Sequence, residues 1–130
     1  MMKTTLRVIK VVHVKNSQVL ADKCVVAESF FNRLKGLLGT TSLKSGEGLL
    51  LRPCNDIHMW FMSIPIDVIF IRRESTFDGC SFYRVTSCNK NLQPWRMMPL
   101  RDGFASETLE LPVGTIDRCH VYEGDVLCIS

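Results

Sequence analysis

The sequence has 130 residues, of which 46% are hydrophobic and 22% are charged, as in an ordinary soluble globular domain and unlike a disordered or fibrous chain. This length fits one domain spanning residues 1–130. The formal net charge of +3 is slight and evenly spread, so neither nucleic acid nor an anionic membrane is an expected partner. No run of about 18 apolar residues could span a bilayer.

The N-terminal residues lack a signal-peptide pattern. Lys10, His13 and Lys15 interrupt the apolar residues, and no Ala-x-Ala cleavage pattern follows cleanly. We therefore expect a cytoplasmic location.

Two strands are predicted first along the chain. Thr4–Lys15 and Gln18–Val26 read as strands, and Asn16-Ser17 supplies turn residues between them, so the pair is predicted to form a hairpin. One face of the first strand carries the apolar residues Leu6, Val8, Val12 and Val14. Ile9 and Val11 load the other face too, so the register stays open.

The hydrophobic period then changes. Apolar residues recur at helical spacing over Glu28–Gly39, which predicts one short amphipathic helix with Ser29 able to cap its start and Gly39 its end. Gly36 within this helix permits a close approach of another backbone.

Pro53 to Ile71 combines an apolar strand with a polar loop. Leu49–Leu51 predicts a short strand before it, and Ile64–Ile71 is apolar on both faces apart from Asp67, which is typical of a strand covered on both sides. The loop carries polar or titratable residues just before an aromatic pair: Cys54, Asn55, Asp56 and His58, then Trp60 and Phe61. Such a loop beside a rigid strand is a usual place for a functional site.

The second half of the chain predicts further short strands. Arg72–Gly79 is charged and ends in Asp-Gly, which indicates an exposed connection. Phe82–Ser87 is predicted to return as a strand, and the two prolines of Asn89–Pro99 exclude a central strand there. Strands are expected at Ala105–Leu111 and Val126–Ile129. The predicted fold is mainly β, a small open barrel or sandwich-like sheet with one or two short helices, bordering on α+β.

The six cysteines do not predict disulfides without a secretory context. No pair has the Cys-x-x-Cys spacing of a zinc or redox motif. Cys24, Cys119 and Cys128 lie among valines and leucines and are interpreted as small core residues.

Several motifs together resemble one family. Pro53–Ile71 is similar to the Pro-Cys-x-Ser-Ile-His-Thr-x-Phe-Met-x-x-Pro-Ile-Asp-Val-x-Phe core of domain-of-unknown-function family 192 (DUF192). Four further segments resemble elements of that family in the same order: Arg33–Leu38, Leu92–Arg96, Leu109–Thr115 and Gly124–Leu127. Asp56 and Met59 depart from its small polar residues, and the connection from Arg72 to Ser81 is longer and more charged than its hairpin. The resemblance implies a compact β-rich fold and no particular reaction.

Asp67 interrupts an apolar strand, and a buried carboxylate without a partner would protonate. We therefore expect a basic group or another hydrogen-bond donor beside it, with Arg96, Arg33 and His58 as candidates. A purely structural Asp–Arg pair that fixes the loop onto the sheet satisfies the same expectation.

A binding site for a small molecule or a protein partner is the favoured functional hypothesis. Aromatic walls with a few convergent polar groups are typical of ligand pockets. The predicted site residues are Asn55, His58, Asp67, Trp95 and Arg96. Arg96 could clamp a carboxylate or phosphate. In the alternative interpretation Trp95 only packs over the end of the barrel. No cofactor is predicted.

Two other functions stay open. Cys54 with His58 and Asp67 has the residue types of a thiol enzyme, in which an imidazole activates a thiolate, although no known cysteine-hydrolase signature surrounds Cys54. Soft ligands are concentrated at Cys54, His58, Met59, Met62, Met97 and Met98, a set that would suit Cu(I). The methionines would serve equally well as core fillers.

Overall fold

A computed structural model describes residues 7–28, 43–57, 64–94 and 99–130. The main strands in these ranges are β1 (Arg7–His13), β2 (Val19–Ala27), β3 (Glu47–Leu51), β5 (Ile66–Phe77), β6 (Cys80–Leu92), β8 (Glu107–Pro112) and β9 (Val126–Ile129). Two short strands, β4 (Asp56–Ile57) and β7 (Leu100–Arg101), form a separate pair. One short helix, α2 (Thr115–Arg118), follows β8. The predicted helix over Glu28–Gly39 lies outside the described residues apart from Glu28.

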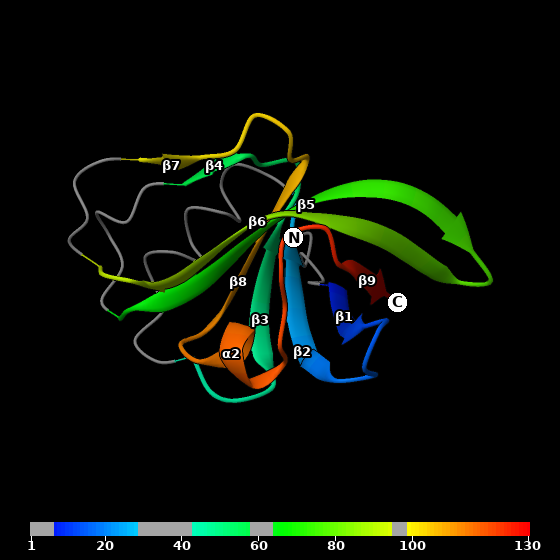
Figure 1. Cartoon of the computed structure of the whole chain (residues 1–130), viewed down its shortest axis with the longest axis horizontal. Helices are drawn as coiled ribbons and strands as arrows, with labels where there is room; N and C mark the ends of the chain where they lie inside the picture. The colour runs from blue at the N-terminus through cyan, green and yellow to red at the C-terminus, as the bar shows by residue number, and fades with distance from the viewer. Residues whose placement is uncertain (1–6, 29–42, 58–63, 95–98) are drawn as a thin grey trace, which may run out of the picture.

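The main strands form a closed barrel in the order β1-β2-β3-β8-β5-β6-β9 (Figure 1). β2 and β3 run parallel, and the other neighbours are antiparallel. The last strand closes the ring, because Cys128 of β9 pairs with Val12 on one side and with Phe82 on the other. The mainly β prediction is confirmed, and the sheet is closed rather than open.

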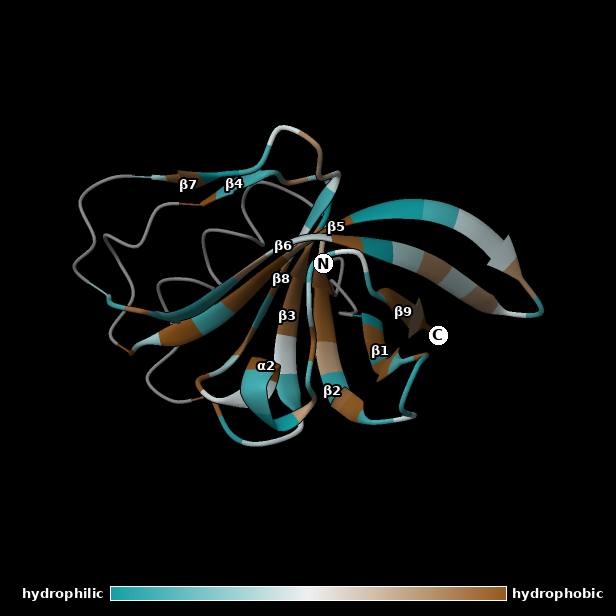
Figure 2. Ribbon diagram, viewed as in Figure 1, coloured by the Kyte–Doolittle hydropathy of each residue, from teal (hydrophilic) through white to brown (hydrophobic). Residues whose placement is uncertain are grey.

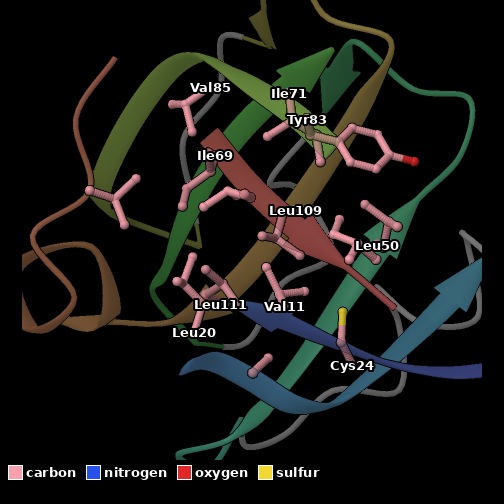
Figure 3. Close-up of a cluster of buried hydrophobic side chains, with 14 of the residues drawn as sticks. Val11, Leu20, Cys24, Leu50, Ile69, Ile71, Tyr83, Val85, Leu109 and Leu111 are labelled. Carbon is pink, nitrogen blue, oxygen red and sulfur yellow. The ribbon is translucent and has the colours of Figure 1, made fainter. Parts of the chain in front are cut away.

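The barrel interior is the main hydrophobic core. Ile69, Leu109 and Leu111 point into it from β5 and β8, and Val11 and Leu20 complete it from the N-terminal hairpin (Figure 3). The sequence left open which face of the first strand lies in the core, and its described residues decide this. Ile9 and Val11 are buried in β1, whereas Val8 and Val14 are exposed, because the inward-facing residues of β1 fill the barrel.

A second apolar cluster covers the outer face of the barrel and is called the outer apolar layer here. Its buried members are Ala27, Leu51, Ile57, Ile66, Val68, Phe70 and Leu92. Alternate residues of β5 therefore contribute to two cores, since Val68 faces outward and Ile69 faces inward. This explains why the strand is apolar on both faces.

The charged connection predicted over Arg72–Gly79 is wrong. β5 continues to Phe77, and Asp78-Gly79 turns the chain into β6, with both turn residues at positive φ. Figures 1 and 2 show this hairpin extending beyond the barrel, with mostly polar residues along its β5 side. A strand that leaves the barrel can be polar on both faces, so its sequence loses the apolar pattern. β6 also runs on to Leu92, through part of the loop predicted at Asn89–Pro99.

The prediction for the cysteines is partly wrong. Cys24 and Cys119 are fully buried in the core as expected, and burial raises the pKa of Cys24 to about 12. Cys128 instead forms a disulfide with Cys80 of the neighbouring strand, with the Cα atoms 5.9 Å apart. Disulfides persist mainly in oxidising compartments, so this bond does not favour the expected cytoplasmic location.

Candidate functional site

An open cleft of about 420 Å³ lies beside the polar loop that follows β3. Its walls are Pro53, Cys54, Asn55, Asp56, Ala105 and Ser106. Backbone bonds hold the two walls together: Cys54 N–H donates to the Ser106 carbonyl at 3.0 Å, and Asp102 N–H donates to the Asn55 carbonyl at 2.9 Å. The Thr108 hydroxyl also donates to the Cys54 carbonyl at 2.8 Å. The cleft therefore rests on β8 and on the outer apolar layer.

Two of the five predicted site residues lie within the described ranges. Asn55 lines the cleft. Asp67 is buried at the other end of the barrel-forming part of β5, about 13 Å along the strand from Ile71, whose carbonyl accepts the Ser106 N–H near the cleft. His58, Trp95 and Arg96 lie outside the described residues.

The Asp67 carboxylate accepts three backbone hydrogen bonds. Asn91 N–H donates to Oδ1 at 2.9 Å, and Gly114 and Ile116 donate to Oδ2 at 3.1 and 3.0 Å. The expected donors are therefore present as backbone amides at the end of β6 and the start of α2. Of the side chains predicted as partners, Arg33, His58 and Arg96 all lie outside the described residues.

The described strands bring the ends of the two predicted site loops together. Ile57 of β4 pairs with Leu100 of β7, so residue 58 leaves the same strand pair that residue 98 enters. At the other end Ile66 of β5 pairs with Leu92 of β6. Segments 58–63 and 95–98 therefore connect the same two pairs of strands.

Cys54 is half-buried in the cleft wall, and its thiol donates to the Asp56 carbonyl at 2.9 Å. The other proposed ligands and reactive groups near it, His58, Met59 and Met62, lie outside the described residues. Within the ranges that are described, no three His, Cys, Asp or Glu side chains come close enough to hold a metal ion.

Sequence reasoning missed a buried acid on β8. Glu110 is only 2% exposed, faces the outer apolar layer between Leu49 and Val68, and has no hydrogen-bond partner for Oε1 among the described residues. Burial raises the pKa of this carboxyl to about 8. The alternation of Leu109, Glu110 and Leu111 places Glu110 opposite the barrel interior, a position that the sequence alone would assign to solvent.

A second missed group is a polar cluster at the base of the β5–β6 hairpin. The buried Tyr83 hydroxyl donates to Glu107 Oε1 at 3.0 Å and accepts from Arg52 at 3.0 Å and from Arg73 at 3.1 Å. Arg52 Nε also forms an ion pair with Glu107. Burial is the largest cause of the raised pKa of Tyr83, followed by its hydrogen bond to Glu107. The cluster satisfies its own donors and acceptors, so we interpret it as structural.

Residues 10–129 match the model of a protein family, DUF192, described as "Uncharacterized ACR". The chain belongs to this family. The resemblance noted in the sequence is thus confirmed. The description of this family names no reaction, substrate or partner.

Individual proteins of similar sequence or structure agree with this family and fold. A UPF0127 protein of Thermococcus sibiricus is 31% identical over 112 residues, which cover 83% of this chain and 66% of that protein, just under two thirds of its length. A protein of unknown function from Novosphingobium aromaticivorans shares the fold with a TM-score of 0.74, at 24% identity over 94% of this chain and 84% of that one. A putative transcription regulator from Sinorhizobium meliloti also has a TM-score of 0.74, at 19% identity over 98% and 95% of the two chains. These two structures show the fold alone.

None of the helices in the described ranges is long and apolar enough to cross a membrane.

Proposed function

We propose that this DUF192 protein is a small-molecule-binding β module. Its site is formed by Asn55 with His58, Trp95 and Arg96, and Asp67 fixes the base of the site without contacting the ligand. The observation that carries the proposal is the shared anchoring of segments 58–63 and 95–98 between the β4–β7 pair and the β5–β6 pair.

Common anchors favour convergence of the two segments. Each is short, and both their starts and their ends are joined to paired strands. The cleft beside Asn55 opens next to β4, where segment 58–63 begins.

The residue types suit a small polar or charged ligand with an aromatic or ring-shaped body. Trp95 and Trp60 offer flat apolar surfaces, Arg96 offers a planar set of donors, and Asn55 adds amide hydrogen-bonding groups. Asp67 holds Asn91 at the end of β6 and thereby fixes the chain shortly before Trp95.

A ligand screen by saturation-transfer NMR tests this proposal. The library contains neutral, anionic and cationic aromatic compounds and simple sugars. We expect saturable binding to the wild type and loss of that binding in Arg96→Ala. Arg101→Ala is the matched control, because Arg101 is an exposed arginine on β7 close to the same segment, and this variant should bind normally.

Stability measurements make the screen interpretable. Urea unfolding should show Arg96→Ala and His58→Ala within about 0.5 kcal/mol of the wild type, as for groups that the fold does not need. Absence of any binding compound, or binding that Arg96→Ala and His58→Ala both leave unchanged, would overturn the proposal.

A further inference from the structure

The β5 strand has an unpaired edge along the outer half of the β5–β6 hairpin. β8 pairs with β5 only as far as Ile71, whereas β5 continues to Phe77 paired with β6 alone. Ser106 ends the contact with β8, since its hydroxyl accepts the Arg73 N–H at 3.3 Å. Figure 1 shows no described segment beside the outer side of β5 from there to the tip. The β5 edge over residues 74–77 is called the free edge here.

The turn at the tip determines which backbone groups face the free edge. Asp78 and Gly79 form a two-residue turn, both at positive φ, and Phe77 pairs with Cys80 across it. The pair that flanks such a turn exchanges its backbone hydrogen bonds, and the next pair along an antiparallel ladder does not. The N–H and C=O of Thr76 therefore point away from β6, toward the free edge.

Opposite charges lie at the two ends of the free edge. Arg72 and Arg73 lie at the base, where β5 leaves the barrel, and Asp78 lies at the tip. Arg72 and Asp78 are exposed, and neither forms an ion pair among the described residues. Phe77, next to Asp78, is 75% exposed. Charges of one sign would repel a second copy of the strand, whereas these charges complement one another in an antiparallel pair.

We propose that the free edge pairs with the free edge of a second copy of this chain, antiparallel and about a twofold axis. Such an axis places the base of each hairpin beside the tip of the other. Arg72 of one copy then lies near Asp78 of the other, an ion pair that neither residue makes within its own chain. Arg73 of one copy lies near Phe77 of the other, a cation beside an aromatic ring.

A register centred on Ser75 makes these contacts together. Glu74 of one strand lies opposite Thr76 of the other, so the outward N–H and C=O of Thr76 reach the backbone of the second copy. The opposite edge of the hairpin is already paired with β9, so each copy offers one edge and the pair closes as a dimer. The interface is short, and we expect a weak, reversible dimer.

Sedimentation velocity over a concentration series tests the inference with the full chain. We expect a monomer–dimer equilibrium, with dimer present by about 1 mM protein, the weak end of specific association. Added salt should lower the dimer fraction, because it screens the charges at base and tip. A protein that stays monomeric up to that concentration would overturn the inference.

Thr76→Pro removes the outward N–H and no bond of the β5–β6 ladder, since proline is tolerated on a strand edge whose N–H is unpaired. It should weaken the dimer at least about tenfold, because each copy loses one hydrogen bond to the other. Thr76→Ala is the matched control: it loses the hydroxyl near Ser81 and keeps the N–H, so it should dimerise like the wild type. A folded Thr76→Pro protein that dimerises normally would contradict the assigned edge.

A double-mutant cycle tests the contact between base and tip without altering the backbone. Arg72→Gln and Asp78→Asn each remove one charge, and asparagine tolerates the positive φ of this turn position. Each variant should weaken the dimer at least about twofold at low salt, and the double variant should be no weaker than either one. Losses that simply add, or no loss at all, would exclude this ion pair and the register centred on Ser75.

Backbone amide hydrogen exchange locates the contact on the protein. The Thr76 amide should exchange more slowly as the protein concentration rises, while the amide of Lys15, exposed in the β1–β2 turn, should not change. Slowing confined to another surface would overturn the inference. An amide NMR spectrum verifies that each variant is folded. Dimerisation and ligand binding are measured separately, so neither result decides the other.

Discussion

The Asp67 carboxylate accepts the backbone N–H of Ile116, 49 residues further along the chain, at 3.0 Å. The same oxygen accepts the Gly114 N–H, and the other oxygen accepts the Asn91 N–H. One side chain thus joins the start of β5 to the end of β6 and to the first turn of α2. This acid stabilises the framework between the two loops that carry the proposed site.

Removal of the Asp67 carboxylate should strongly destabilise the protein. Asp67→Ala leaves the N–H groups of Asn91, Gly114 and Ile116 without their acceptor, and each lost hydrogen bond costs about 1 kcal/mol. We expect a loss of more than about 2 kcal/mol in the free energy of unfolding, measured by urea denaturation. Asp67→Asn retains one oxygen and should lose less.

Asp117→Ala is the matched control on α2, since its carboxylate makes only an exposed ion pair with Lys90 among the described contacts and should change stability by less than about 1 kcal/mol. Equal losses in Asp117→Ala and Asp67→Ala would contradict the role assigned to Asp67.

The hydroxyl of Tyr83 should contribute measurably to stability. Tyr83→Phe deprives Glu107 of a donor and Arg52 and Arg73 of an acceptor while keeping the aromatic ring in the core. We expect a loss of about 1–2 kcal/mol by thermal or urea unfolding. Tyr122→Phe, which changes an exposed tyrosine, should have no effect. A Tyr83→Phe protein as stable as the wild type would show that the cluster is energetically neutral.

Glu110 should make stability fall as the pH rises. Its native pKa is raised from 4.5 to about 8, so between these values the native state holds a proton that the unfolded state has released. The free energy of unfolding therefore decreases through this window and levels off above it. Unfolding in urea across the window should show this slope for the wild type and a flatter one for Glu110→Gln. Equal slopes for both proteins would refute a buried, protonated Glu110.

The bond between Cys80 and Cys128 should stabilise the closed barrel. It closes a loop of 48 residues, and disulfides of this kind contribute about 2–4 kcal/mol by restricting the unfolded chain. Cys80→Ser, Cys128→Ser and the double variant should lose the same amount of stability, since each removes the same bond. Non-reducing peptide mass spectrometry checks the pairing. Detection of both cysteines as free thiols after air exposure would contradict it.

The apolar parts of the fold were predictable from the sequence, and the polar contacts between distant segments were not. Ile64–Ile71 reads as a doubly covered strand because both faces are apolar, and β5 contains most of it. Arg72–Phe77 reads as a connection because a strand outside the barrel needs no apolar face. The alternation of apolar residues indicates which face of a strand is buried. It therefore cannot identify a strand whose two faces are both exposed.

Only part of the candidate site could be predicted from the sequence. Asn55 was chosen for its place in a polar loop and lines the cleft, and its part in ligand binding stays a prediction. The sequence showed that Asp67 needs donors, but the amides of Asn91 and Ile116 become its partners only through the barrel closure. Glu110 looks solvent-facing until the outer apolar layer is known to cover it.

The most direct test of a ligand-binding function locates the bound compound on the protein. The measurement is a titration of ¹⁵N-labelled wild type with the tightest compound from the screen, followed through its backbone amide shifts. We predict saturable shifts at Asn55, Ile57 and Ser106, with Glu123 unchanged. Saturable shifts confined to the opposite side of the barrel, at β1 and β9, would contradict the account.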